Sequence, residues 1–589
     1  MRNFLSSLLA TIVGILIMTL LIVLIFAGIV AVSKSQEVPE VTENSLLLAK
    51  FNAPIADRSD ENPLSRFMSG NPYSEDMMGL NQILKDLDKA AADEKIKGIF
   101  LKLGNVSAGV ATLGEIRDAL LEFKESGKFI YAYADVYSQK SYYLASAADT
   151  VFMTPEGMLL FTGLSAEINF YKNALKKAGV DMQVVKHGSY KSAAERFTRE
   201  DLSKENQEQI EAYMGAVWDK IVGDIAESRQ IPEEELNRIA DQLTTLDADK
   251  LVETGMIDGL IYYDEMLSLI KGKMGVEEED DLESISLKQY KDVPAEEKKE
   301  YSRDKIAVIY AMGTVVDGNA GEGMIGSERI ARAIRKARRD KSVKAIVFRI
   351  NSGGGSALAS DVIYREAMLA AKEKPLVASM GDVAASGGYY IAAPADTILA
   401  SPGTITGSIG VVFTLPNMQE LMNNKLGVTT DVVKTNRHAD MLTIMDPLDP
   451  VEKVYVQRMV DDTYKAFVNV VAQGRGMTFE EVDAIGGGRV WAGEDALDNG
   501  LIDMFGGLER SIEIAAEMAG LEIYRIQSLP TLEDPLTMIM KELKGGATAR
   551  SSRAIKQELG DLYVHYRTLK EIGEMHGVQA IMPFEIELH

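Results

Sequence analysis

Two residues in different halves of the chain could together carry out acyl transfer without a histidine. Ser386 lies in the tight turn Ala-Ser-Gly-Gly, and Lys191 lies in HGSYKSA. A serine hydroxyl attacks a carbonyl when a base takes its proton, and a neutral lysine amine can be that base. The pKa of such a lysine must fall from about 10.4 toward about 7, through burial or a nearby positive charge. The pair is therefore suited to acyl transfer.

These two residues stand out because the chain contains one module twice. Residues 97–149 align with residues 344–396 at a constant offset of 247, and Ser386 then matches a glutamine in the first copy. Further on, AGVDMQVVKHGSYKSA aligns with LGVTTDVVKTNRHADM at an offset of 248, and Lys191 matches an alanine in the second copy. One copy keeps the serine and the other keeps the lysine. This complementary loss predicts that the two halves share one site.

A glycine run supplies backbone groups that could stabilise negative charge. Gly353-Gly354-Gly355 follows a predicted strand and precedes a predicted helix, a position where backbone N–H groups bind anions. The first copy has Val-Ser-Ala there, so the glycines are lost together with the serine. We expect an oxyanion hole made by the N–H of Gly354 or Gly355 and the N–H of Gly387, each donor contributing about 3–4 kcal/mol.

Each candidate also has a structural interpretation. Ser386 alone could be an N-cap serine, and Lys191 alone a solvated surface lysine. Of the five histidines, only His187 and His438 lie outside the C-terminal tail, and no pattern supports a Ser-His-Asp triad with either. The coupled loss in the two copies favours the serine and the lysine.

Composition excludes several functional classes. A chain of 589 residues predicts more than one domain. The net charge of −25 argues against a nucleic-acid partner, whose phosphates need basic residues. The absence of cysteine removes disulfides, thiol nucleophiles and cysteine-based metal sites. No metal or nucleotide motif is present, so no cofactor is expected.

The N-terminal segment predicts a membrane anchor. Residues 3–33 contain no charged side chain and are mostly apolar. A spanning helix needs about 20 such residues, whereas the core of a cleavable signal peptide has about 7–15. An uncleaved signal anchor is therefore favoured over a cleaved signal peptide. Arg2 precedes the segment and acidic residues follow it, which predicts that the bulk of the chain lies outside.

The elements that must position the site follow the same order in each copy. An apolar strand, a polar turn, a second apolar strand, an amphipathic helix and a third apolar strand predict parallel βαβ units and an α/β fold. The strands are expected at 46–51, 99–103 and 129–133 in the first copy, and at 306–312, 345–350 and 376–380 in the second.

The repeats set the domain boundaries. We expect an anchor with a short linker at 1–45, a first repeat that supplies the lysine at 46–276, a charged linker at 277–304, a second repeat that supplies the serine at 305–529, and a tail at 530–589. The tail has no counterpart in the first copy and is expected to be peripheral.

Four segments together resemble signal peptide peptidase A in its long, duplicated, membrane-anchored bacterial form. They are GSYKSAAERF (188–197), RINSGGGSA (349–357), GDVAASGGYYIA (381–392) and SPGTITGSIGV (401–411). The resemblance covers nearly the whole chain and implies a ClpP/crotonase-like domain in each half. It implies that Ser386 is the nucleophile, Lys191 the general base and Ser408 the serine that orients the lysine amine. The family usually has proline at Gly353, so this glycine loop is expected to be more flexible.

The resemblance also implies a function and a location. We expect a serine endopeptidase that degrades cleaved signal peptides, anchored in the bacterial cytoplasmic membrane with its catalytic domains on the periplasmic side. A homotetrameric ring is expected, and the sequence leaves open whether lysine and serine meet within one chain or between chains. Two alternatives are a crotonase-like acyl-thioester enzyme, which predicts a carboxylate base facing the oxyanion hole, and an inactive membrane scaffold, which predicts no reaction with serine-directed inhibitors.

Overall fold

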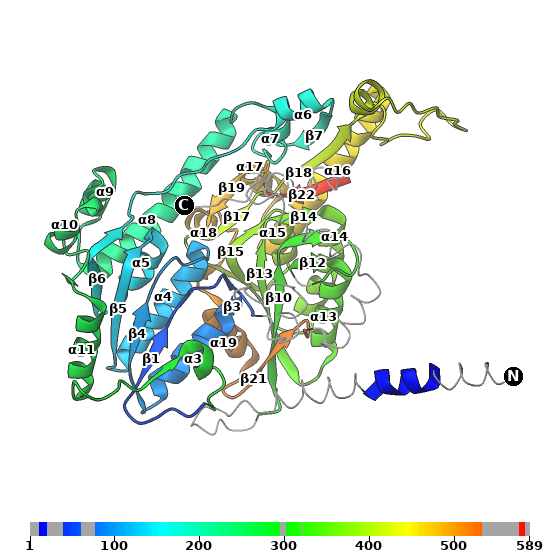
Figure 1. The fold of residues 1–589 in the computed structure, drawn as a ribbon. Coiled ribbons are helices and arrows are strands. Elements are labelled where there is room, and N and C mark those ends of the chain that lie inside the picture. The colour runs from blue at the N-terminus through cyan, green and yellow to red at the C-terminus, as the bar shows by residue number, and fades with distance from the viewer. Residues whose placement is uncertain are drawn as a thin grey trace.

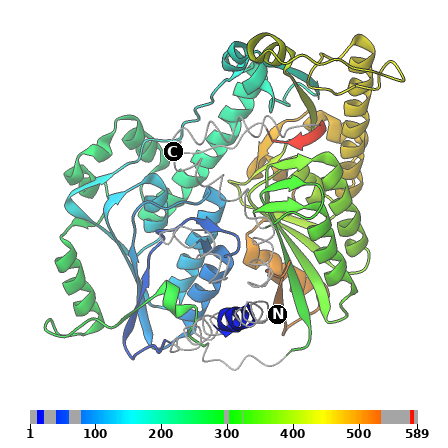
Figure 2. The ribbon, with the colours of Figure 1, turned by 45° about the vertical axis from the view of Figure 1, so that its right-hand side comes forward.

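A computed structural model describes residues 11–20, 39–59, 77–294, 302–321, 323–532 and 577–582. Two α/β units lie side by side, the first coloured blue to green and the second green to orange (Figures 1 and 2). Most of the predicted anchor, and the stretch 533–576 of the predicted tail, lie outside the described residues. Residues 11–20 are helical, and among the described residues no helix has the length and apolar character needed to span a membrane.

The first unit is built on a parallel sheet of six strands in the order β8-β6-β5-β4-β1-β9. Its strands are β1 (Ser45–Ala49), β4 (Ile96–Lys102), β5 (Phe129–Tyr137), β6 (Thr150–Leu159), β8 (Gly259–Leu260) and β9 (Ser284–Ser286). Its main helices are α3 (Leu80–Ala92), α4 (Val110–Glu125), α5 (Gln139–Ala145), α8 (Lys204–Arg229), α9 (Glu233–Asp241), α10 (Ala248–Glu253), α11 (Tyr263–Met274) and α12 (Leu287–Tyr290). Ile99 and Leu101 pack into one core cluster and Phe100 into another, so β4 is apolar on both faces, as a covered parallel strand must be.

The second unit repeats this plan with an eight-stranded sheet in the order β19-β17-β15-β13-β10-β21, in which β16 also pairs with β15 and β20 pairs with β16. Its strands are β10 (Lys305–Met312), β13 (Val343–Ser352), β15 (Leu376–Ala385), β16 (Thr397–Ala400), β17 (Ile405–Gly407), β19 (Val490–Ala492), β20 (Met504–Phe505) and β21 (Arg525–Leu529). Its main helices are α13 (Ser327–Arg339), α14 (Ala357–Ala371), α15 (Gly387–Ala392), α16 (Pro450–Arg475), α17 (Phe479–Ile485), α18 (Gly493–Asp498) and α19 (Leu508–Ala519). The predicted parallel βαβ units are therefore confirmed. Two strands run further than predicted, β13 to Ser352 and β15 to Ala385, and both lead directly into the candidate site.

A third sheet joins the two halves in the order β12-β11-β14-β22-β18-β7. Its strands are β7 (Asp181–His187), β11 (Thr314–Val316), β12 (Met324–Gly326), β14 (Gly354–Ser356), β18 (Val411–Asn417) and β22 (Gly577–Ile581). Strand β7 comes from the first repeat and pairs antiparallel with β18 of the second along its whole length. The red strand β22 lies between β14 and β18 (Figure 1). Residues 577–582 of the predicted tail are therefore part of the sheet that joins the two halves.

A buried ion cluster also holds the halves together. Arg349 of β13 is fully buried, and its guanidinium donates to Asp57 Oδ1 at 2.6 Å and to Glu115 Oε1 at 2.6 Å. Asn351, two residues further along β13, donates to the other oxygen of Asp57 at 3.0 Å. Both carboxylates belong to the first repeat. The cluster therefore fixes the first repeat against the strand that leads into the glycine run.

Replacing Arg349 by methionine is expected to lower the free energy of unfolding by about 3–5 kcal/mol, because two buried carboxylates lose their counter-charge. Urea denaturation followed by circular dichroism would measure this. Arg510→Met is the matched control, since its bridge to Glu513 is exposed and should contribute less than about 1 kcal/mol. Equal losses in the two variants would contradict a structural role for the cluster.

Candidate active site

Ser386 occupies a strained turn between β15 and α15. Its backbone has φ 56° and ψ −115°, a conformation that side-chain-bearing residues rarely adopt. The turn is held from both sides, because the Ser386 N–H donates to the Gly407 carbonyl at 2.8 Å and its own carbonyl accepts from the Tyr390 N–H at 2.9 Å. The side chain is fully buried at the start of α15. The Ser386 hydroxyl therefore lies close to the N–H groups at the N-terminus of α15.

Lys191 reaches this serine from the other repeat. It follows β7, and its Nζ donates to Ser386 Oγ at 2.8 Å, to Ser408 Oγ at 3.0 Å and to the Ser408 carbonyl at 3.1 Å. The structure thus brings together three of the residues singled out from the sequence, and it does so within one chain.

The environment of Lys191 disfavours its charged form. The side chain is fully buried, and burial lowers the pKa of Lys191 well below its ordinary value. The hydrogen-bond acceptors around its Nζ are hydroxyl and carbonyl oxygens rather than a carboxylate. A neutral amine has a lone pair that can accept the proton of Ser386. The arrangement therefore suits a general base.

Glycines make the space in which Lys191 lies. A Cβ atom on Gly488, whose φ is +87°, would come within 2.6 Å of the Lys191 backbone nitrogen, and one on Gly410 within 3.1 Å of Lys191 Cδ. Ser408 is held in position because its N–H donates to the Arg489 carbonyl at 2.6 Å. Two chain segments of the second repeat therefore wrap closely around the lysine of the first.

The predicted oxyanion glycines lie beside Ser386 but differ in their hydrogen bonding. Gly354 has a φ of +97°, and its N–H donates to Ser352 Oγ at 3.1 Å. The predicted donor role of Gly354 would require this bond to be given up. Gly387 begins α15 directly after Ser386, and Gly355 lies in β14. The amides of Gly355 and Gly387 stay the predicted donors.

Comparison with known proteins identifies the family. Residues 122–277 and 368–522 match Peptidase family S49. The chain belongs to this family. One matched segment falls in each repeat, which confirms the duplication seen in the sequence. "Protease 4" of Salmonella typhi is 35% identical over 538 residues, covering 88% of this chain and 86% of the relative. "Serine protease SPPA, chloroplastic" of Arabidopsis thaliana is 34% identical over 557 residues, covering 92% of this chain and 78% of the relative.

Solved structures add little to this family assignment. A ClpP1 mutant from Listeria monocytogenes aligns over 35% of this chain and 94% of its own, with 13% identity and a TM-score of 0.23. That score carries no weight for the fold. The S49 chain is therefore an α/β protein with two family segments, and its finer description as ClpP/crotonase-like stays a prediction.

The two histidines considered from the sequence have partners elsewhere in this S49 chain. His187 Nδ1 lies 2.8 Å from Asp461 Oδ1, and His438 Nδ1 lies 3.1 Å from Glu452 Oε1. Among the described residues, the side chain that contacts the Ser386 hydroxyl is that of Lys191. The contacts therefore favour a lysine rather than a histidine beside the serine.

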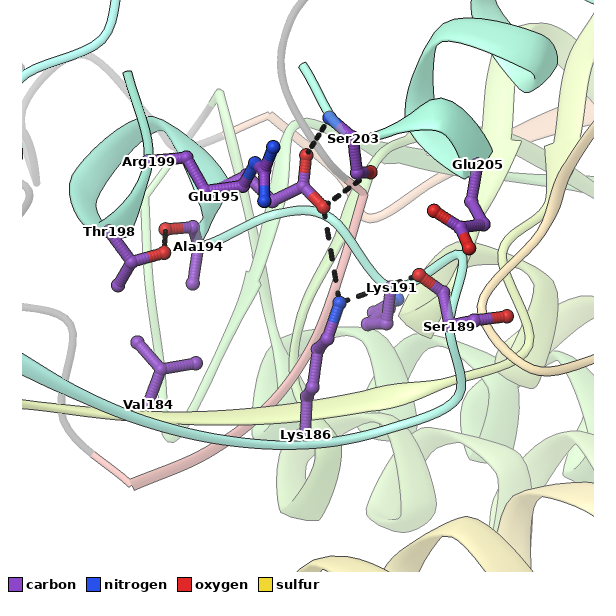
Figure 3. A pocket seen from close by; sticks show the side chains of 10 residues that line it. All are labelled: Val184, Lys186, Ser189, Lys191, Ala194, Glu195, Thr198, Arg199, Ser203 and Glu205. Carbon is purple, nitrogen blue, oxygen red and sulfur yellow. Dashed lines mark hydrogen bonds and ion pairs between the residues drawn. The ribbon is translucent and has the colours of Figure 1, made fainter. Parts of the chain in front are cut away.

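A pocket of about 380 Å³ opens beside Lys191 (Figure 3). It is lined by Val184, Lys186, Ser189, Lys191, Ala194, Glu195, Thr198, Arg199, Ser203 and Glu205. The Glu195 carboxylate is held in position at one wall of the pocket, because it accepts a hydrogen bond from Ser203 Oγ at 2.7 Å and lies 4.0 Å from Lys186 Nζ. The apolar side chains Val184 and Ala194 form another part of the wall. The pocket thus offers space for a side chain next to the buried amine.

Sequence reasoning missed two features of the site in this S49 chain. Ser352 fixes the glycine run, since its Oγ donates to the Gly313 carbonyl at 2.6 Å while accepting from Gly354. Its position directly before the glycines was the available signal. Strand β22 was missed because a short segment far along the chain carries no pattern that points to the site.

Proposed function

We propose that this S49 protein is a serine endopeptidase in which Ser386 is the nucleophile and Lys191 the general base. The observation that carries the proposal is the 2.8 Å contact between Lys191 Nζ and Ser386 Oγ, two atoms of fully buried side chains. The acyl-thioester alternative predicted a carboxylate base at this position. The described partner of the serine is an amine instead, which favours peptide hydrolysis.

The reaction follows from the geometry. The neutral Lys191 amine takes the proton of Ser386 Oγ as the oxygen attacks the peptide carbonyl, and the amides of Gly355 and Gly387 stabilise the oxyanion. The resulting ammonium then gives its proton to the leaving amine. Water, deprotonated by the same lysine, hydrolyses the acyl-enzyme. Ser408 accepts a hydrogen bond from the lysine and keeps its amine aimed at the serine through both steps.

We propose cleaved signal peptides as the substrates and the cytoplasmic membrane as the location, with the catalytic units on the periplasmic side. The uncharged stretch at 3–33 and the resemblance to signal peptide peptidase A support this. A vesicle assay tests it: full-length protein in proteoliposomes should remove a labelled, membrane-inserted signal peptide faster than a version lacking residues 1–38. Equal rates would contradict a role for the anchor in presenting the substrate.

We also propose that copies of the chain assemble head to tail into a closed ring, predicted to be a tetramer. The support comes from comparing β7 and β18 with the segments that correspond to them in the other repeat. By the repeat offsets, the counterpart of β7 is 429–435 and that of β18 is 164–170. These two described segments are not assigned to any strand, and Val433 is 98% exposed. Pairing of 429–435 with 164–170 of the next copy would repeat the β7–β18 contact. Each copy would then contribute 429–435 to one neighbour and 164–170 to the other, so that the copies could close into a ring.

Light scattering of the purified protein tests the assembly. Val433→Pro should reduce the molar mass to that of one chain, because proline has no N–H group to donate to a neighbouring strand. An unchanged mass would exclude this pairing. The protein used for this measurement can begin at residue 39, after the predicted anchor.

Labelling with a fluorophosphonate probe tests the catalytic proposal. The probe should modify Ser386 in the wild-type protein, as located by peptide mass spectrometry, and should fail to modify Lys191→Met. Lys186→Met is the matched control, because Lys186 lines the same pocket but is partly exposed, and its Nζ lies 4.0 Å from the Glu195 carboxylate. Absence of label on folded wild-type protein would exclude the endopeptidase and favour the scaffold.

A further inference from the structure

A buried amide side chain lies between the two segments that carry the site. Gln209 belongs to α8 of the first repeat and is fully buried. Its amide nitrogen donates to the Tyr190 carbonyl at 3.3 Å and to Ser192 Oγ at 3.0 Å, on either side of Lys191. Its amide oxygen accepts from the Val490 N–H at 3.1 Å, in β19 of the second repeat. One side chain therefore joins the segment that carries the proposed base to a strand of the other repeat.

The strand that this amide contacts also holds the two serines of the site. Val490 opposes Gly407 in the antiparallel pairing of β19 with β17, and the Gly407 carbonyl accepts from the Ser386 N–H at 2.8 Å. The carbonyl of Arg489, the residue before Val490, accepts from the Ser408 N–H at 2.6 Å. A shift of β19 relative to α8 would therefore move both serines relative to the lysine.

Neighbouring buried polar groups fix the orientation of the amide. Asn206, nearly one helical turn before Gln209, accepts at Oδ1 from the Gln209 amide at 2.9 Å and from Ser192 Oγ at 2.8 Å. Its own amide nitrogen donates to Glu195 Oε2 at 3.2 Å, and Figure 3 shows Glu195 at the wall of the pocket beside Lys191. Asn206 and Ser192 are 1% and 2% exposed, so water does not replace these partners.

An apolar cluster encloses the contact between the repeats. Ile210 and Tyr213, which lie on the same face of α8 as Gln209, pack in one cluster with Val490 and with Ala385, the residue before the nucleophile. Hydrogen bonds in such surroundings are stronger than in water and are costly to leave unmade. The amide is therefore a rigid connection between the repeats rather than a loose one.

The corresponding helix of the second repeat lacks this amide. Helices α8 and α16 each have 26 residues and align at an offset of 246, which places Arg229 on Arg475. Each of these arginines pairs with an aspartate of its own repeat. At the same offset Gln209 matches Tyr455, whose side chain is 57% exposed. The buried amide is therefore confined to the copy that keeps the lysine.

We propose that Gln209 is a positioning residue that sets the geometry between the Lys191 amine and the Ser386 hydroxyl. This rests on the proposed Ser386/Lys191 mechanism. Gln209 acts through Lys191, because its hydrogen bonds on both sides of the lysine hold that backbone against β19. A catalytic group misplaced by about 1 Å can lower the rate on the order of 10²-fold. The amide thereby makes the activity of the site depend on close docking of the two repeats.

Gln209→Met separates positioning from packing, since methionine keeps the length and volume of the side chain but cannot make the hydrogen bonds of the amide. We expect kcat on an external peptide to fall about 10²-fold, with KM within a few-fold of the wild-type value. Gln207→Ala is the matched control, because this amide of the same helix is exposed and donates to Glu211 Oε1 at 2.8 Å. A kcat for Gln209→Met equal to that of the control would overturn the proposal.

The pH dependence of kcat supplies a readout that a loss of stability would not change. Burial lowers the pKa of Lys191. If Gln209→Met releases the lysine segment, water reaches the amine and its pKa rises toward the ordinary value, so the increase of kcat with pH should move to higher pH. The charged side chains that line the pocket beside Lys191 are the same in both proteins: Lys186, Glu195, Arg199 and Glu205. Partial unfolding would lower kcat without this shift, and an unshifted profile in folded Gln209→Met would overturn the proposal.

Ser192→Ala keeps the proposal testable if Gln209→Met does not fold. It removes the hydroxyl between the two amides but leaves Gln209 bonded to Asn206, to the Tyr190 carbonyl and to the Val490 N–H. We expect a loss of kcat of about 10-fold, as for one hydrogen bond, with the same shift of the profile to higher pH. Wild-type kcat and an unshifted profile in this variant would overturn the proposal.

The fluorophosphonate probe distinguishes failure of this proposal from failure of the mechanism on which it rests. Label on Ser386 that forms at the same rate and with the same pH profile in wild type and Gln209→Met would overturn the positioning role and leave the endopeptidase in place. Absence of label on folded wild-type protein would overturn both.

Discussion

Lys191→Met is expected to abolish peptide cleavage and to stabilise the fold at neutral pH. Loss of the general base should lower kcat/KM by at least about 10⁴-fold, as removal of one member of a catalytic unit does in other serine hydrolases. Methionine keeps most of the buried volume but removes an amine whose protonation is opposed by burial. Peptide hydrolysis and thermal unfolding of the same preparation would measure both effects.

The pH dependence has a definite sign. Because the pKa of Lys191 is lowered in the folded state, the unfolded chain binds more protons between that pKa and the unfolded value of about 10.4. Wild-type stability should therefore rise with pH across this interval relative to Lys191→Met, and the advantage of the variant should vanish near its upper end. Cleavage should rise with pH through the lowered pKa, as the neutral amine becomes populated. Parallel stability curves for the two proteins would contradict a buried, neutral lysine.

Gly354→Ala should lower kcat/KM by at least about 10²–10³-fold, the loss typical of a damaged oxyanion site. The added Cβ would meet only backbone atoms and Ser386 Cβ, at 2.1, 2.6 and 3.1 Å, and a φ of +97° strains any side chain. The Ala580 carbonyl and the Gly387 amide are backbone groups, so no flexible side chain can move to make room for the added Cβ. Steady-state kinetics on an external peptide would measure the loss.

Gly353→Ala is the matched control for this steric argument. Its Cβ would lie 3.5 Å from the Met582 side chain, an ordinary contact, and its φ is not positive. We expect activity within a few-fold of wild type. Equal losses of kcat/KM in the two variants would show that the glycine loop tolerates no added methyl group. They would contradict the specific steric effect predicted for Gly354.

The sequence carried more information about this site than about the sheet that assembles it. Comparison of the repeats singled out Ser386 and Lys191, which the structure places in hydrogen-bonding contact. Apolar runs predicted the strands of the two parallel sheets, because burial on both faces leaves a local signature. Ser408 was singled out only through the family resemblance, since a serine between glycines has no distinctive local pattern.

Two non-local features could not be predicted from local patterns. Strand β14 consists of two glycines and a serine, which have no strand propensity, and it exists because β11 and β22 pair with it. Asp57 and Arg349 are separated by 292 positions, so their ion pair depends on how the repeats dock. Pairing between distant segments is decided by tertiary packing, so it cannot be predicted from the residues of one short segment.

The division of the site between the repeats has a consequence for the newly made chain. Lys191 and Ser386 are 195 positions apart, and each lies in a different repeat. During synthesis the proposed base therefore emerges long before the proposed nucleophile, and neither residue alone would form the proposed site. Peptidase activity should appear only when both repeats have folded and docked. A protease built in this way is harmless to the nascent proteins around it until it is complete, with no inhibitory pro-segment required.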